Sequence, residues 1–147
     1  MKATRRQARE WAVQMLVAAD LNPSQDLKSS MDSFWDLVGS IAENGGEGIK
    51  GKLRDFAEER FLGVMERREE IDETLSSLLA NWDLSRLGTV ERAVLRMGVW
   101  ELAHSGVPKA VAINEAIDLV NWFSSPKSRT IVNGVLDKYA KLLPATR

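Results

Sequence analysis

Apolar residues recur along most of this chain at the three- and four-residue spacing of amphipathic α-helices. The pattern is clearest near the N-terminus, where it predicts a helix over about 4–19 with a buried face. Asn22-Pro23 ends this helix, because the residue before a proline is held out of the helical region. No segment combines apolar–polar alternation with the Asn-Gly or Asp-Gly turns of β-hairpins. The pattern therefore predicts an all-α protein.

The same spacing, read together with capping residues, predicts the remaining helices. Their expected ranges are about 31–42, 52–81 with a break near 67–71, 89–103, 108–123 and 126–143. Ser30, Thr89 and Ser125 are the expected N-caps, and Asp72 is the expected cap after the break. Gly134 lies within the last helix, where glycine costs about 1 kcal/mol relative to alanine, so we expect a close helix contact there.

Helices of this length bury their apolar faces only against one another, which predicts a helix bundle or a pair of bundles. We expect about seven helices in one compact domain over 1–147. The glycine-rich stretch 44–48 is expected to be a loop. Trp82 lies in a later connection, where we expect it to pack in the core rather than to stack on a ligand.

Composition narrows the possible functions. The chain has 147 residues, of which 44% are apolar and 28% charged, as in soluble globular proteins. There is no apolar run of about 18 residues and no signal-type N-terminus, so we expect a cytoplasmic protein. The absence of cysteine excludes disulfides, thiolate catalysis and cysteine zinc sites.

Catalytic motifs are also missing. The one histidine, His104, lies at an expected helix end with no nucleophile and orienting acid marked near it in the sequence. The stretch 46–52 lacks the spacing of a phosphate-binding loop. A di-metal helical bundle would need Glu-x-x-His motifs, and none occurs. We therefore expect a protein that is not an enzyme and holds no metal.

The net charge is −1, but basic residues gather at the N-terminus. The first ten residues contain Lys2, Arg5, Arg6 and Arg9 against a single acidic residue. Lys2, Arg5 or Arg6, and Arg9 recur at a spacing of three to four residues, which directs them along one side of the first helix and leaves the arginines free of the core. Guanidinium groups bind phosphates and stack on unpaired bases, so the cluster favours single-stranded RNA. An acidic protein patch and a solvated helix start are the alternative interpretations.

Several segments, in this order, resemble the NusB family. They are residues 5–14, 90–96, 101–102, 111–116 and 131–138. The resemblance covers nearly the whole chain, and it is poorest over 22–52. It implies an all-α fold of two packed helical subdomains, here expected over 1–80 and 81–147.

The resemblance also implies a role in transcription antitermination, without a cofactor or catalysis. With a NusE-like small-subunit ribosomal protein, the chain is expected to bind the boxA element of nascent rRNA transcripts. The complex is then expected to join the elongating RNA polymerase together with other Nus factors. The rival hypothesis is a helical protein–protein adaptor that binds no RNA of its own.

The residues implied as RNA contacts are Lys2, Arg5, Arg6 and Arg9, the same four that the charge pattern selects. The resemblance further implies Glu91 as a contact to the NusE-like partner. A carboxylate that stabilises the positive end of its own helix is an equally good interpretation of Glu91.

Two positions depart from the family pattern. Val17 replaces a tyrosine that many relatives carry, which removes one possible base-stacking surface. Lys127 stands where relatives tend to carry an acidic residue, so we expect a different charge on the partner surface. Asn114 and Asn133 are expected to form hydrogen bonds between helices. A further expectation is an internal ion pair of Arg96 with Glu115.

Overall fold

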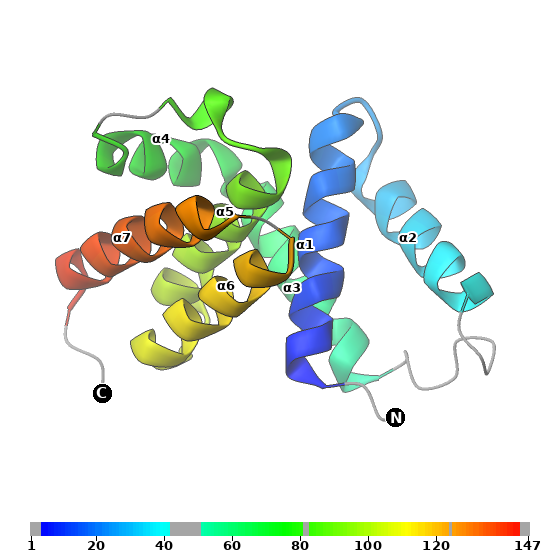
Figure 1. Ribbon diagram of the computed structural model, residues 1–147. Helices are drawn as coiled ribbons and strands as arrows, with labels where there is room; N and C mark the ends of the chain where they lie inside the picture. The colour runs from blue at the N-terminus through cyan, green and yellow to red at the C-terminus, as the bar shows by residue number, and fades with distance from the viewer. Residues whose placement is uncertain (1–3, 42–50, 81–82, 124, 145–147) are drawn as a thin grey trace. The chain divides into compact units, whose positions relative to one another are not determined.

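The computed structural model describes residues 4–41, 51–80, 83–123 and 125–144 (Figure 1). Within these ranges the chain forms seven α-helices and one short 3₁₀-helix, and no strand, which confirms the all-α prediction. The predicted loop 44–48 and Trp82 lie outside the described residues. By its internal contacts the chain divides into two compact units, Met1–Leu62 and Gly63–Arg147.

The first unit contains α1 (Arg5–Leu21), α2 (Leu27–Ile41) and most of α3 (Lys52–Glu66). Helix α1 begins where expected, because the side chain of Thr4 caps it and accepts a hydrogen bond from the backbone N–H of Gln7 at 3.2 Å. It ends at Leu21 with Asn22 as its C-cap, as the following proline predicts. The apolar face of α1 is buried, and α1 packs against α2.

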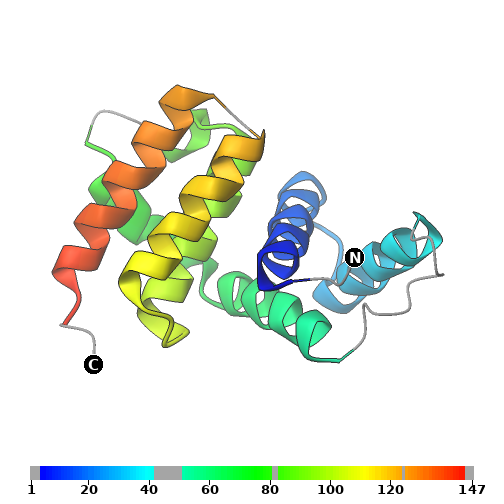
Figure 2. The same ribbon diagram turned by 60° about the horizontal axis from the view of Figure 1, so that its bottom comes forward.

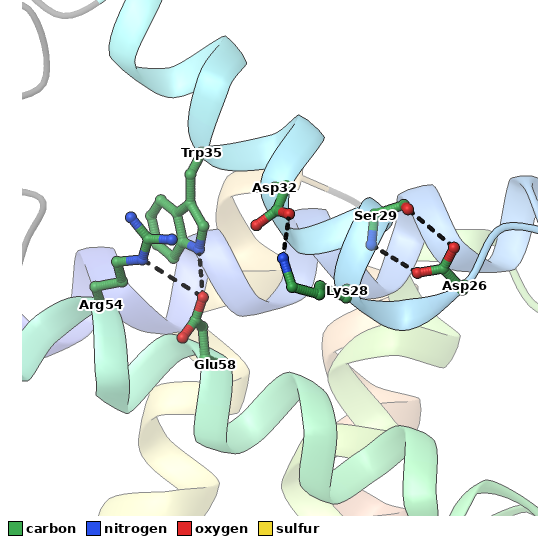
Figure 3. Close-up of polar contacts among 7 residues, drawn as sticks. All are labelled: Asp26, Lys28, Ser29, Asp32, Trp35, Arg54 and Glu58. Carbon is green, nitrogen blue, oxygen red and sulfur yellow. Dashed lines mark hydrogen bonds and ion pairs between the residues drawn. The ribbon is translucent and has the colours of Figure 1, made fainter.

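Helix α2 starts four residues before the predicted position. Asp26 takes the capping role: its carboxylate accepts hydrogen bonds from the backbone N–H of Ser29 at 2.8 Å and from the hydroxyl of Ser29 at 2.9 Å (Figure 3). The prediction of Ser30 as N-cap is therefore wrong, and Ser30 lies buried within the helix. Both residues favour caps, and only the earlier one lies next to the chain reversal at Pro23.

Trp35 links the three helices of this unit. Its indole ring, from α2, meets Trp11 of α1 edge-to-face with ring centroids 5.5 Å apart. The indole N–H donates a 2.8 Å hydrogen bond to Glu58 of α3, and the guanidinium of Arg54 lies 5.1 Å from the ring centroid (Figure 3). The apolar surface of the indole is thus buried, and its N–H has a hydrogen-bond acceptor. These contacts fix how α1, α2 and α3 pack.

The second unit contains α4 (Arg68–Leu78), the 3₁₀-helix η1 (Leu84–Arg86), α5 (Thr89–His104), α6 (Lys109–Phe123) and α7 (Pro126–Leu142). Helix α5 is its centre, because it contacts α4, α6 and α7 and its residues 93–101 are all buried. Helices α6 and α7 lie side by side (Figure 2). The division between the units lies earlier than the boundary expected near residue 80, because α4 packs on α5 and α7.

Polar contacts at the helix ends of this unit differ from the predictions in two places. The predicted break before α4 occurs at Arg67, but Asp72 is no cap: it lies inside α4 and pairs with Arg96 of α5. The N-cap of α5 is Gly88, one residue before the predicted Thr89. Ser125 caps α7 as predicted, with Pro126 as the first helical residue.

Close helix packing occurs at glycines other than the predicted one. Gly134 is exposed, and a Cβ added to it would meet no atom within 4 Å, so the expected contact there is wrong. A Cβ at Gly98 of α5 would instead lie 2.7 Å from Leu136 of α7. One at Gly63 of α3 would overlap the indole ring of Trp100. These two glycines allow the helices to approach closely.

Lys109, at the start of α6, holds the C-terminal end of α7. Its ammonium group donates hydrogen bonds to the backbone oxygens of Ala140 at 2.9 Å, Leu143 at 3.3 Å and Pro144 at 2.9 Å. The last carbonyls of a helix have no partner within the helix, so this lysine caps them and completes the end of α7. None of the helices in the described ranges has the length and apolar character needed to cross a membrane.

Candidate nucleic-acid interface

The predicted arginine cluster lies at the start of α1. Arg5 and Arg6 occupy its first turn, where both are exposed and no acidic side chain is present. The backbone amides at a helix start carry partial positive charge, so the two guanidinium groups add to a potential that already attracts anions. Lys2, the fourth predicted RNA contact, lies outside the described residues.

Arg9 does not face solvent as the charge pattern suggested. It is only 4% exposed, so the expectation that all the arginines remain free of the core is wrong for this residue. The reason is its place on the helix, three residues before Ala12 and four before Val13, both of which are buried. Its role as an RNA contact stays a prediction.

Three guanidinium groups gather around the ring of Phe56, a partly exposed residue of α3. The Cζ atom lies 5.9 Å from the ring centroid for Arg5, 5.1 Å for Arg9 and 3.4 Å for Arg60. Arg5 and Arg9 come from α1, whereas Arg60 belongs to α3. The negative face of an aromatic ring attracts cations at these distances, so Phe56 brings the basic residues of two helices together.

Arg60 is buried and held by hydrogen bonds within α3. It is 2% exposed, and its Nη1 donates to the carboxylate of Glu59 at 2.8 Å and to the backbone oxygen of Phe56 at 3.4 Å. The prediction from sequence missed Phe56 and Arg60. Their i,i+4 spacing was a usable signal for a local pair, but it did not reveal that α1 packs beside them.

The two predicted partner contacts lie close to each other in the second unit. Glu91, in the first turn of α5, accepts a 3.1 Å hydrogen bond from the hydroxyl of Ser128 in α7. Lys127 precedes Ser128 in the chain and is exposed. The starts of α5 and α7 therefore form one surface of mixed charge, and the assignment of both residues to a partner stays a prediction.

The other residues that the sequence singled out are exposed or partly exposed. His104 is exposed at the end of α5, and Asn114 and Asn133 are exposed on α6 and α7 rather than buried between helices. Val17 is partly exposed on α1. Among the described residues no group of three or more histidine, aspartate or glutamate side chains is placed to hold a metal ion.

The start of α1, with Arg5, Arg6 and Arg9, is called the arginine surface below. The fold and this surface define a small all-α protein with a basic first helix. The family model described as "NusB family" matches residues 6–141, and this chain belongs to that family. It is 40% identical to the transcription antitermination protein NusB of Wolinella succinogenes, over 92% of this chain and 93% of that protein.

Two solved structures are similar in fold. T. maritima NusB superposes with a TM-score of 0.78 at 30% identity, covering 96% of this chain and 93% of that one. A structure of the antitermination factors NusB and NusE in complex with dsRNA superposes with a TM-score of 0.77 at 28% identity. That match covers 95% of this chain and 97% of the other.

Proposed function

We propose that this protein is an RNA-binding transcription antitermination factor. With a NusE-like small-subunit ribosomal protein, it binds boxA-type single-stranded RNA of nascent rRNA transcripts and joins the elongating RNA polymerase complex. It acts by binding and performs no catalysis. Because the role requires access to nascent transcripts, we also propose a cytoplasmic location.

The observation that carries the proposal is the basic start of α1 in a member of the NusB family. Arg5 and Arg6 are exposed beside the positive end of the helix, and the guanidinium of Arg9 lies 5.1 Å from the centroid of Phe56. Arginine contacts phosphates through two parallel hydrogen bonds, and exposed guanidinium planes also stack on unpaired bases. A surface with few phosphate contacts binds RNA weakly by itself, which favours joint binding with a second protein.

The start of α5 and α7 is the proposed surface for the NusE-like protein. Glu91 presents its carboxylate there while Ser128 holds it by a hydrogen bond, and Lys127 is exposed beside it. A carboxylate in a fixed position and a neighbouring ammonium select a partner surface with the opposite pattern of charges. The similar complex of NusB, NusE and dsRNA supports a partner of this kind.

Anisotropy titration of a labelled boxA-type RNA tests the proposal. The RNA is titrated with this protein, with the NusE-like protein and with both together, and an unlabelled duplex of the same length serves as competitor. The double variant Arg5→Gln/Arg6→Gln should weaken binding by about tenfold or more, since each lost charged hydrogen bond is worth about 1.5 kcal/mol. The matched control is Arg67→Gln/Arg86→Gln, which removes the same charge from exposed arginines of the second unit.

We expect the control variant to bind like the parent protein, and the protein pair to bind more tightly than either protein alone. Equal affinity of the parent and of Arg5→Gln/Arg6→Gln would contradict the proposed RNA surface. Binding to the NusE-like protein with no measurable binding of RNA, alone or jointly, would favour the adaptor hypothesis instead.

A further inference from the structure

The ring of Phe56 lies where the basic residues of two helices meet. The guanidinium groups of Arg5 and Arg9, from α1, and of Arg60, from α3, all lie within 5.9 Å of its centroid. Like charges repel one another, and the negative faces of the ring offset part of this repulsion. Phe56 therefore offsets part of the repulsion within this cluster, together with the Glu59 carboxylate that pairs with Arg60 at 2.8 Å.

Arg60 contacts the Phe56 ring and is too buried to contact RNA. At 2% exposure its guanidinium is not accessible to RNA, and it is held by the Glu59 carboxylate at 2.8 Å. With its Cζ 3.4 Å from the ring centroid, it is in direct contact with Phe56. Arg60 thus holds the Phe56 ring in one orientation. The arginines of α1 then pack against a ring whose position is fixed.

Arg5 is the exposed residue that gains from this arrangement. A free arginine side chain loses much rotamer freedom when it binds a phosphate, and a side chain already ordered loses less. Arg5 is exposed, yet its guanidinium lies 5.9 Å from the Phe56 centroid. The ring restricts the directions that Arg5 samples while leaving its hydrogen-bond donors available to a phosphate.

We infer that Phe56 and Arg60 are positioning residues of the arginine surface, which orient the exposed Arg5 before RNA binds. This inference rests on the proposed function and adds α3 to the elements that determine RNA affinity. Neither residue needs to contact RNA for this role. The presence of an aromatic ring at position 56 therefore controls affinity through an arginine of another helix.

The test compares two phenylalanine-to-leucine variants in the same unit. Phe56→Leu removes the ring from the arginine cluster, and Phe34→Leu is the matched control, since Phe34 is also partly exposed and packs on Trp35 with centroids 5.1 Å apart. Phe56→Tyr restores an aromatic face. Each variant is checked by circular dichroism and thermal unfolding and is then titrated with boxA-type RNA at several salt concentrations.

Phe56→Leu should bind RNA about five- to tenfold more weakly, and its dependence of log affinity on log salt should flatten by about 0.7 for each phosphate that the arginines no longer neutralise. Phe56→Tyr and Phe34→Leu should keep the parent values. NMR gives a second measurement without RNA: the side-chain protons of Arg60 should show ring-current shifts that Phe56→Leu abolishes.

Parent-like affinity and salt dependence in Phe56→Leu would overturn the positioning role while leaving the proposed function intact. Equal weakening by Phe56→Leu and Phe34→Leu would also overturn it, because the effect would then be a general loss of packing. Parent protein that binds no RNA, with or without the NusE-like protein, would remove the proposed function and the positioning role together.

Discussion

The guanidinium of Arg96 on α5 forms a bidentate ion pair with the carboxylate of Asp72 on α4. Its Nε lies 2.8 Å from Oδ1 and its Nη2 lies 3.0 Å from Oδ2. Arg96 is 6% exposed, so water does not solvate its charge, and groups within the protein must stabilise it instead. Loss of the Asp72 carboxylate takes two charge-assisted hydrogen bonds from a buried guanidinium, at a large cost in stability.

Asp72→Asn is therefore expected to lower the free energy of unfolding by about 3 kcal/mol. The matched control is Asp137→Asn, which removes an exposed carboxylate paired with Lys141 at 3.0 Å in α7. Exposed pairs contribute less than about 1 kcal/mol, so this variant should unfold like the parent protein. Urea unfolding followed by circular dichroism measures both. Equal effects of the two substitutions would show that burial of Arg96 does not set the strength of its pair.

Two glycine-to-alanine substitutions should change stability in opposite directions. A methyl group at Gly63 would overlap the indole of Trp100, which is 7% exposed and rigid, so Gly63→Ala should destabilise the fold by about 2 kcal/mol. Gly134 is exposed within α7 and has open space around it, so Gly134→Ala should stabilise the fold by about 1 kcal/mol. Thermal unfolding measures both. A stabilised Gly63→Ala variant would contradict the close packing of Gly63 on Trp100.

Tyr139 on α7 should ionise at a higher pH than a free tyrosine. Burial raises the pKa of Tyr139 above its ordinary value of 10.0, and the nearby Glu70 carboxylate of α4 raises it further. A raised pKa favours the neutral phenol in the folded state. Its contribution to stability is therefore complete below pH 10.0 and is lost as the pH rises through the folded-state pKa.

Tyr139 is the only tyrosine in the sequence, so tyrosinate absorbance reports this residue alone. Glu70→Gln should move the titration midpoint of Tyr139 toward 10.0 without reaching it, because burial is the larger cause. The control variant Glu69→Gln removes the same charge from the neighbouring position of α4 and should leave the midpoint unchanged. A parent midpoint at or below 10.0 would rule out the described environment of Tyr139.

Local sequence signals predicted the helices well because these signals act within a few residues. Thr4 and Ser125 cap α1 and α7 as expected, and the break between α3 and α4 lies at the start of the predicted region. Ser30 and Thr89 were wrong as caps because several residues near each helix start favour the same role. Which one takes it depends on the path of the preceding chain.

Charged residues were harder to place. The spacing of Arg5, Arg6 and Arg9 located the basic surface on α1, and it did not show that Arg9 turns toward Phe56. Asp72 was expected to cap α4 and instead pairs with Arg96. A long charged side chain reaches several neighbours, and the partner that it finds is set by helices distant in the sequence.

The periodic placement of apolar residues, the helix caps and the order of the family motifs were enough to determine an all-helical member of the NusB family with a basic first helix. These properties follow from neighbours three or four positions apart, or from direct resemblance. Tertiary packing alone decided that Arg60 and Phe56 join Arg5 and Arg9, and that Gly63 rather than Gly134 admits a neighbouring helix. Such contacts depend on which helix faces lie against each other, and no local pattern in one helix specifies the surface of the next.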